Sequence, residues 1–228
     1  MSEIERLTFD DQNELHAALA DEMRRAIASG REKRGSALLA LSGGSSPFPI
    51  YRSLAEEDLG WAEVTIIPVD ERLVPENDKL SNTAKLREVF EPAGARVLGL
   101  FPDPETDPLP PSALDVVDLP ADLLWLGMGG DGHFASVFPG PDYERAFATE
   151  DDTVFVNPFP MPAEAPVGRL SIAPRAIAAS RRLILVIAGR DKRAVFDRAL
   201  AEGTASPYPM GRFLEELQPT MTVYEGLF

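Results

Sequence analysis

The 228-residue sequence contains no cysteine. This absence excludes a disulfide scaffold, a thiol nucleophile and any metal centre built on cysteine. Histidine is almost as scarce, since the chain has only two, and neither belongs to an HExxH pattern typical of zinc hydrolases. We therefore predict that the protein uses no metal and no other cofactor.

Long apolar runs are missing as well. The longest, LILVIA and IIPV, are far too short to cross a bilayer. The first residues, MSEIERLTFDDQNE, are charged and polar, which is unlike a signal peptide. The sequence thus predicts a cytoplasmic protein with no membrane contact.

Basic residues are few, because 22 Lys and Arg stand against 37 Asp and Glu, for a net charge of -15. Binding a polyanion relies on clustered Lys and Arg, so the composition argues against nucleic acid as the partner. A small anionic ligand held by a few local cations remains compatible with it. The length and a hydrophobic share of 44% predict one globular domain over residues 1–228.

Short apolar segments alternate with amphipathic ones along the chain. Buried strands are predicted at SALLALS (36–42), VTIIPVD (64–70), RVLGL (96–100), ADLLWLG (121–127), RLSIA (169–173) and RLILVIAG (182–189). Helices are predicted from a cap at Asp10 or Asp11 to Gly30, and at 48–57, 81–90 and 190–203. Two proline-rich segments, 101–111 and 157–166, are predicted to be surface connections.

This alternation indicates an α/β protein with an open, mainly parallel sheet covered by helices on both faces, as in Rossmann-like folds. In such sheets ligands bind at the carboxyl ends of the strands. The turns that follow the strands are therefore the places to search for a site.

The first of these turns is LSGGSSP. Gly43 and Gly44 leave backbone N–H groups free to face a ligand, and Ser45 adds a hydroxyl ahead of a helix, as in an anion-binding nest. The turn matches neither the P-loop nor the GxGxxG pattern. A plain tight turn with a serine cap explains it equally well.

Two further turns carry charged side chains. VDERLVP places the triplet Asp70, Glu71 and Arg72 where a strand ends, although a solvated charge cluster is the usual explanation of such a triplet. LGMGGDGHFASVFPG has four glycines in the seven positions 127–133, and it presents Asp131 and His133. Glycine at this density marks a sharp turn or a close approach of backbone to a ligand. Asp131 can orient the histidine or simply cap the next turn.

Taken together, four segments in order resemble the 6-phosphogluconolactonases: LSGGSSP, VDERLVPENDKLSN, GMGGDGHFASVFPG and the late RLS with GRDKRAVF. The resemblance covers residues 36 to 200. It implies hydrolysis of 6-phospho-D-glucono-1,5-lactone to 6-phosphogluconate in the pentose phosphate pathway. It also implies an open sheet related to the sugar-phosphate isomerases.

The resemblance implies roles for individual residues. His133 would be the general base that activates water, since histidine titrates close to neutral pH, with Asp70 and Asp131 as orienting carboxylates. Arg72 and Lys192 would hold the substrate phosphate. The remaining substrate-binding set would be Gly43, Gly44, Ser45, Asn82, Gly129 and Arg169. Because no GxSxG elbow is present, an acyl-enzyme on serine is not expected.

Two other functions stay open from the sequence. In deaminases of the glucosamine-6-phosphate type the histidine segment continues as DGHIAFNEPG, and its glutamate joins the ring opening. This chain has Phe138 there, which cannot transfer a proton. The second alternative is a sugar-phosphate-binding domain without catalysis. The expected partner is the small lactone alone, bound by a monomer or a weak homo-oligomer.

Overall fold

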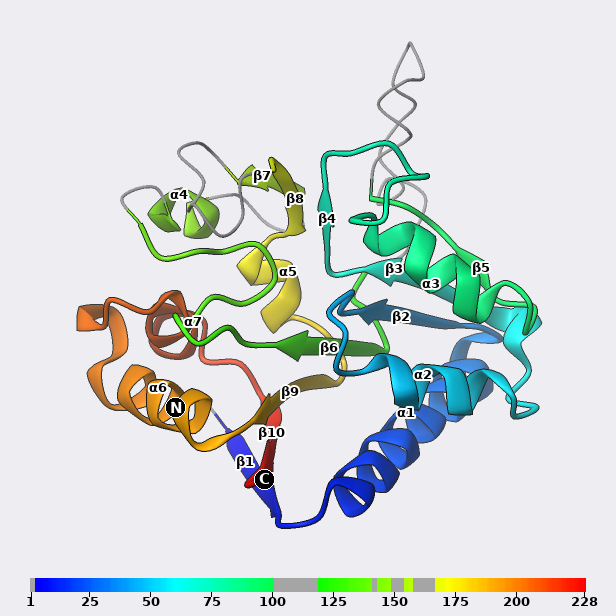
Figure 1. The fold of residues 1–228 in the computed structure, drawn as a ribbon, viewed down its shortest axis with the longest axis horizontal. Coiled ribbons are helices and arrows are strands. Elements are labelled where there is room, and N and C mark those ends of the chain that lie inside the picture. The colour runs from blue at the N-terminus through cyan, green and yellow to red at the C-terminus, as the bar shows by residue number, and fades with distance from the viewer. Residues whose placement is uncertain (1–2, 101–118, 141–142, 149–153, 158–166) are drawn as a thin grey trace.

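A computed structural model describes residues 3–100, 119–140, 143–148, 154–157 and 167–228. At its centre is a seven-stranded sheet in the order β1-β10-β9-β6-β2-β3-β5, in which every neighbouring pair is parallel (Figure 1). Its strands are β1 Ile4–Phe9, β2 Ala37–Leu41, β3 Val64–Pro68, β5 Arg96–Val97, β6 Leu123–Gly127, β9 Leu183–Ala188 and β10 Met221–Gly226. This architecture confirms the predicted α/β class.

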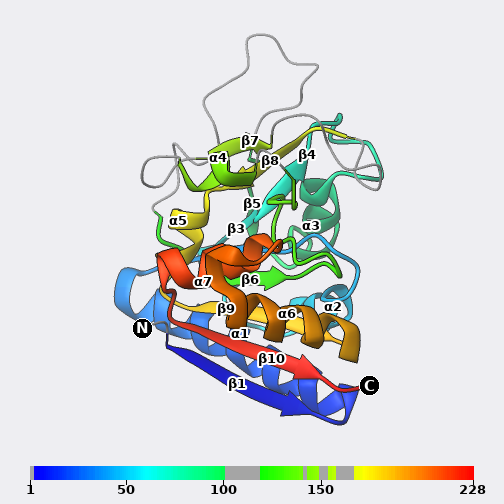
Figure 2. The same ribbon diagram turned by 90° about the vertical axis from the view of Figure 1, so that its left-hand side faces the viewer.

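Helices cover both faces of this sheet, as Figures 1 and 2 show from two directions. One face carries α1 Gln12–Arg34, α2 Phe48–Ala55 and α3 Asn82–Phe90, and the other carries α5 Pro174–Ala178, α6 Arg190–Glu202 and α7 Pro209–Leu217. Short elements complete the described chain: α4 Tyr143–Phe147 and the 3₁₀ turns Trp61–Glu63 and Gly203–Ala205. None of the described helices is long and apolar enough to cross a membrane.

Burial on both faces explains the unbroken apolar strands. In β2, Leu39 and Leu41 pack with α1 and α2, while Leu38 and Ala40 belong to the core on the side of α6 and α7. Successive side chains of a strand point to opposite faces, so a strand covered on both sides must be apolar at every position. The two hydrophobic cores, one on each face, hold the sheet between two layers of helices.

Helix α1 starts as predicted but ends later. The side chain of Asp11 accepts hydrogen bonds from the N–H groups of Asn13 and Glu14, which is an N-cap. The prediction that Gly30 ends the helix is wrong, because Gly30 is buried within it. Gly35, with φ 76°, takes the left-handed conformation that ends the helix.

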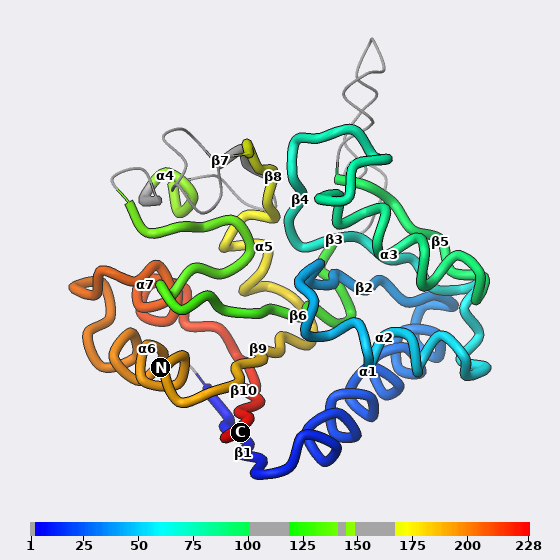
Figure 3. The backbone as a smooth tube through the Cα atoms, in the orientation of Figure 1, coloured from blue at the N-terminus to red at the C-terminus, as the bar shows by residue number. Residues whose placement is uncertain are grey.

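A second, three-stranded sheet corrects another expectation. RLSIA forms β8 Arg169–Ile172, which pairs antiparallel with β4 Asp70–Arg72 and β7 Val154–Asn157 and lies outside the parallel sheet. Figure 3 shows β4 and β8 side by side above the large sheet. The DER triplet is thus a strand rather than a turn, and this small sheet forms one wall of the site below.

Some elements had no prediction. They include the edge strand β1, its neighbour β10 and helix α7. The predicted strand RVLGL forms a strand only at Arg96–Val97. The proline-rich segments predicted as surface connections, 101–111 and 157–166, lie outside the described residues except for Asn157 in β7.

A buried carboxylate ties α1 to the sheet. Glu22 is 5% exposed and accepts hydrogen bonds from Arg182 at 2.6 Å, Arg25 at 2.8 Å and the Tyr224 hydroxyl at 2.8 Å. Burial alone would raise the pKa of Glu22, but these donors outweigh it and bring the pKa down to about 2. The charged form of Glu22 therefore stabilises the fold.

This pKa gives the sign of a stability prediction. Because the folded pKa lies below the ordinary 4.5, the stabilisation is present above about pH 4.5 and is lost as the pH falls toward 2. We expect Glu22→Gln to lower the free energy of unfolding at pH 7 by about 3 kcal/mol. Urea unfolding at pH 7 and pH 3 checks this, since the difference between variant and wild type must shrink at pH 3.

Candidate active site

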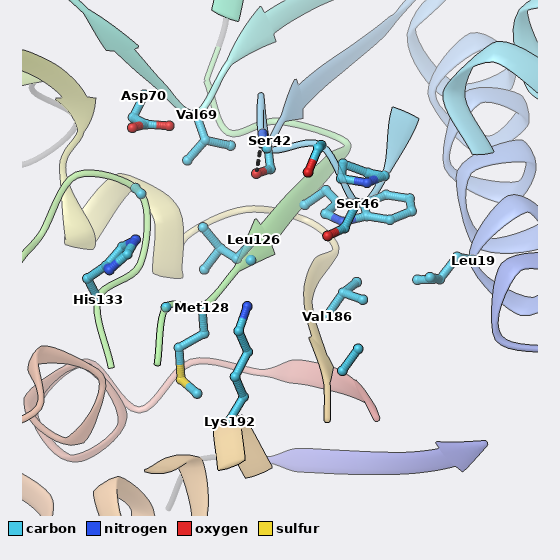
Figure 4. Close-up of a pocket in the computed structure, with 18 of the residues that line it drawn as sticks. Leu19, Ser42, Ser46, Val69, Asp70, Leu126, Met128, His133, Val186 and Lys192 are labelled. Atoms are coloured by element: carbon cyan, nitrogen blue, oxygen red, sulfur yellow. Dashed lines mark hydrogen bonds between the residues drawn. The ribbon is translucent and has the colours of Figure 1, made fainter. Parts of the chain in front are cut away.

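The turns after the parallel strands meet around one cavity of about 970 Å³. Ser45 follows β2, Asp70 follows β3, His133 follows β6 and Lys192 follows β9. The predicted site residues that line it are Gly44, Ser45, Asp70, Arg72, Asn82, Gly129, Asp131, His133, Arg169 and Lys192. Figure 4 shows Asp70, His133 and Lys192 on different sides of this cavity.

His133 is fixed by a carboxylate two residues before it. The distance between its Nδ1 and Oδ1 of Asp131 is 2.6 Å, and the Gly129 N–H donates to the backbone carbonyl of His133 at 2.9 Å. A carboxylate partner places the ring proton on Nδ1, which leaves Nε2 as the free acceptor. Burial would raise the pKa of Asp131, but the hydrogen bond and charge of His133 outweigh it and lower this pKa.

The histidine turn requires glycine at position 129. A Cβ there would lie 2.2 Å from Nδ1 of His133 and 2.5 Å from Oδ1 of Asp131. Non-bonded atoms do not approach this closely, so any side chain at position 129 would displace His133 and Asp131. The sequence pattern therefore reflects a close approach within the site rather than only backbone freedom.

Asp70 is held on three sides. The Ser136 hydroxyl donates to its Oδ2 at 2.5 Å, and the Asn82 amide donates to its backbone carbonyl at 2.7 Å and more weakly to Oδ1 at 3.4 Å. Arg169 lies 3.8 Å from Oδ2. Oδ1 thus keeps most of its accepting capacity for a hydroxyl group or water in the cavity.

Two arginines form a cationic wall. Arg72 and Arg169 stand directly opposite each other in the antiparallel pairing of β4 and β8. Arg72 donates to the carbonyl of Leu80 at 2.6 Å and to Oδ1 of Asn82 at 2.9 Å. Burial and then the charge of Arg72 lower the pKa of Arg169. Like charges directly opposite on a sheet repel, so this wall suits an anion between or above them.

The remaining predicted residues divide into two groups. Lys192 belongs to the first turn of α6 and points into the cavity (Figure 4). Gly44 and Ser45 line the cavity, whereas Gly43 does not. A Cβ on Gly43 would lie 2.1 Å from Cγ of Asn82, so this glycine lets the turn pack on Asn82.

Three residues at the site were not predicted. Ser136 is buried beside Asp70. Phe138 packs on His133 with ring centroids 4.4 Å apart, and the Arg169 guanidinium lies 5.9 Å from the centroid of the Phe138 ring. The first helix also contributes His16 to the cavity lining. Ser136 and Phe138 lie within the histidine motif, which was the available signal, but nothing in the sequence shows that His16 reaches the cavity.

A histidine–carboxylate pair and several cations gather at the strand ends of a parallel α/β sheet, an arrangement typical of enzyme sites for small anions. Residues 10–222 match the family of glucosamine-6-phosphate isomerases/6-phosphogluconolactonase. The 6-phosphogluconolactonase of Neisseria meningitidis serogroup A is 36% identical over 217 residues, covering 90% of this chain and 92% of the relative. The chain therefore belongs to this family, as one of its 6-phosphogluconolactonases.

Solved structures agree on the fold. A 6-phosphogluconolactonase from Shewanella baltica superposes with a TM-score of 0.83 at 27% identity, over 99% of this chain and 98% of that one. A monomeric glucosamine-6-phosphate deaminase is similar with a TM-score of 0.75 at 22% identity, over 97% of each chain. The second likeness concerns the fold alone, so the two activities must be told apart by side chains.

The glycine at 129 yields a matched pair of variants. Gly129→Ala should lose most activity, about ten- to a hundredfold in kcat/KM, because the methyl group displaces His133. Gly130→Ala, one residue on, meets nothing within 4 Å and has an ordinary φ, so it should keep wild-type activity. Steady-state kinetics on both variants, with circular dichroism to verify folding, checks this. Equal activity in the two variants would contradict the described turn.

Proposed function

We propose that this protein hydrolyses 6-phospho-D-glucono-1,5-lactone to 6-phospho-D-gluconate, with His133 as the general base. The observation that carries the proposal is the His133–Asp131 pair at 2.6 Å in a cavity whose wall holds Arg72 and Arg169. A lactone carbonyl needs an activated water, and a phosphate needs cations. Both requirements are met in one cavity.

The proton path follows from the geometry of the histidine. With Nδ1 bonded to Asp131, Nε2 takes a proton from a water molecule as the water oxygen attacks the lactone carbonyl carbon. The tetrahedral intermediate then collapses and the bond from this carbon to the ring oxygen breaks. The imidazolium returns its proton to the ring oxygen, so the base is regenerated. Asp131 stabilises the transient positive charge on the ring.

Asp70 suits the sugar end of the reaction. Its Oδ2 is taken by Ser136, and its Oδ1 has only the 3.4 Å contact with Asn82 among the described residues. A carboxylate oxygen in this position accepts a hydrogen bond from a lactone hydroxyl or from the attacking water. Asp70 thereby orients one reactant against His133.

The phosphate end lies with the cations. Arg72 and Arg169 come from the small sheet and Lys192 from α6, and the Gly44–Ser45 turn adds N–H and hydroxyl donors. Charge-assisted hydrogen bonds to a phosphate are about twice as strong as neutral ones. A few local cations thus hold a dianion on a chain whose net charge is -15.

Deamination of glucosamine 6-phosphate is the second candidate, because a deaminase shares the fold. Phe138 opposes it, since it presents a ring to His133 where proton transfer would need a carboxylate. A binding domain without catalysis is opposed by the His133–Asp131 pair, which phosphate binding alone does not need.

The role of His133 predicts a large loss on its removal. His133→Ala should stay folded and lose roughly 10²- to 10⁴-fold in kcat, the usual contribution of a positioned general base. The assay follows 6-phosphogluconate formation, corrected for spontaneous hydrolysis of the lactone. A folded variant with turnover close to that of the wild type would remove His133 from the mechanism.

The cations predict a dependence on the substrate. Arg72→Ala and Lys192→Ala should each raise KM for the phosphorylated lactone about ten- to a hundredfold, since a lost charge-assisted bond costs roughly 1.5–3 kcal/mol. Arg72→Lys should recover only part of the loss if the contact is bidentate.

Gluconolactone without phosphate is the control substrate. The wild type should hydrolyse it poorly. Neither Arg72→Ala nor Lys192→Ala should change this rate much, because gluconolactone has no phosphate for Arg72 or Lys192 to bind. Comparing kcat/KM for both lactones across the three variants tests this. Equal losses on the two substrates would place these residues in the fold or in the chemistry.

A further inference from the structure

Glu71 is a buried carboxylate beside the site that the reaction does not use. It lies between Asp70 and Arg72 in β4 and is 3% exposed. Burying a carboxylate is costly unless hydrogen bonds and opposite charges compensate it.

Five hydrogen bonds converge on this one side chain. Oε1 accepts from the backbone N–H groups of Arg72 at 2.7 Å and Asn82 at 2.8 Å. Oε2 accepts from the N–H and the hydroxyl of Thr83 at 2.6 and 2.7 Å, and from the Ser81 hydroxyl at 3.3 Å. The carboxylate thus joins β4 to the beginning of α3.

The donors from α3 are its first N–H groups, which have no partner inside the helix. A carboxylate at this end also gains from the positive end of the helix dipole. Asn82 and Thr83 are the first two residues of α3, and Ser81 is its N-cap. Glu71 hence fixes the start of α3 against the strand that carries Arg72.

Both residues bound to Oε1 continue into the cavity. Arg72 donates to the Asn82 side-chain oxygen at 2.9 Å, and the Asn82 amide donates to the Asp70 carbonyl at 2.7 Å. Asn82 also fills the space that Gly43 leaves open. The direction of the Arg72 guanidinium therefore depends on where the backbones of β4 and α3 are held together.

We propose that Glu71 is a positioning residue for the phosphate end of the substrate. The two bonds on its Oε1 fix the backbone of Arg72 relative to that of Asn82, and this fixed geometry sets the affinity for the phosphorylated lactone. This inference rests on the proposed function, and it assigns Glu71 no contact with the substrate.

The charge of Glu71 by itself predicts the opposite effect. A negative charge near a phosphate weakens phosphate binding, so removing only the charge should lower KM. Removing the hydrogen bonds should raise KM. The sign of the change therefore separates positioning from simple electrostatics.

The experiment compares Glu71→Ala with Glu71→Gln. Both variants lose the charge, but the glutamine oxygen still accepts a hydrogen bond. We expect Glu71→Ala to raise KM for the phosphorylated lactone about tenfold with a smaller change in kcat, and Glu71→Gln to fall between it and the wild type. Neither should change kcat/KM for unphosphorylated gluconolactone by more than about twofold.

Thr83→Val is the matched control, because it removes one bond to Oε2 and leaves both bonds on Oε1. It should lower the melting temperature and keep the wild-type KM. A lower KM in both Glu71 variants would assign the residue to electrostatics alone. Equal losses on both lactones, or a raised KM in Thr83→Val, would make Glu71 merely structural. Each of these results overturns the inference.

Calorimetry with inorganic phosphate separates this inference from the proposed function. If the wild type has no lactonase activity, the proposed function is wrong. Even then, inorganic phosphate should bind the wild type more tightly than it binds the Glu71→Ala variant. Equal phosphate affinities, or no binding to either protein, would overturn the role of Glu71.

Discussion

The repulsion between Arg72 and Arg169 is the constraint on which the site depends. Antiparallel pairing of β4 with β8 sets Arg72 and Arg169 opposite each other, and the carboxylates of Asp70, 3.8 Å from Arg169, and of Glu71 offset part of the repulsion between them. Burial lowers the pKa of Arg169, and the charge of Arg72 lowers it further. An arrangement that costs stability in the empty protein is favourable once an anion occupies the wall.

The rest of the architecture holds Arg72 and Arg169 beside the His133–Asp131 pair. In a parallel sheet buried on both faces, the carboxyl ends of all strands lie at the same end of the sheet, where the turns that follow them line the cavity. The small sheet adds the cations there, while the turn after β6 adds His133, which a close glycine allows to reach Asp131 at 2.6 Å. Under the proposed function, phosphate recognition and proton transfer would come from different elements, so a substitution could alter one without the other.

The elements predicted well were those whose pattern has a single physical cause. The buried strands β2, β3, β6 and β9 are almost entirely apolar, interrupted only by Thr65, because helices cover both their faces. The edge strand β1 was not predicted because it is only partly buried and carries Arg6. Strand β10 was not predicted because it contains Glu225, which is buried and bonded to Arg6 of the neighbouring β1 at 2.6 Å. Gly30 was taken for a helix end because sequence does not distinguish a glycine buried in a helix from one that caps it.

The residues of the candidate site that belong to the sequence motifs could be predicted, because the turns that follow neighbouring parallel strands lie at the same end of the sheet. Its supporting contacts were not, because Ser136 and Asp70 are far apart in the chain and join only in the folded protein at 2.5 Å. The most direct test of the account is the rate at which wild-type protein forms 6-phosphogluconate from freshly prepared lactone at neutral pH. The account predicts a rate proportional to enzyme concentration and well above spontaneous hydrolysis. A rate equal to the spontaneous one, together with ammonia release from glucosamine 6-phosphate, would contradict it.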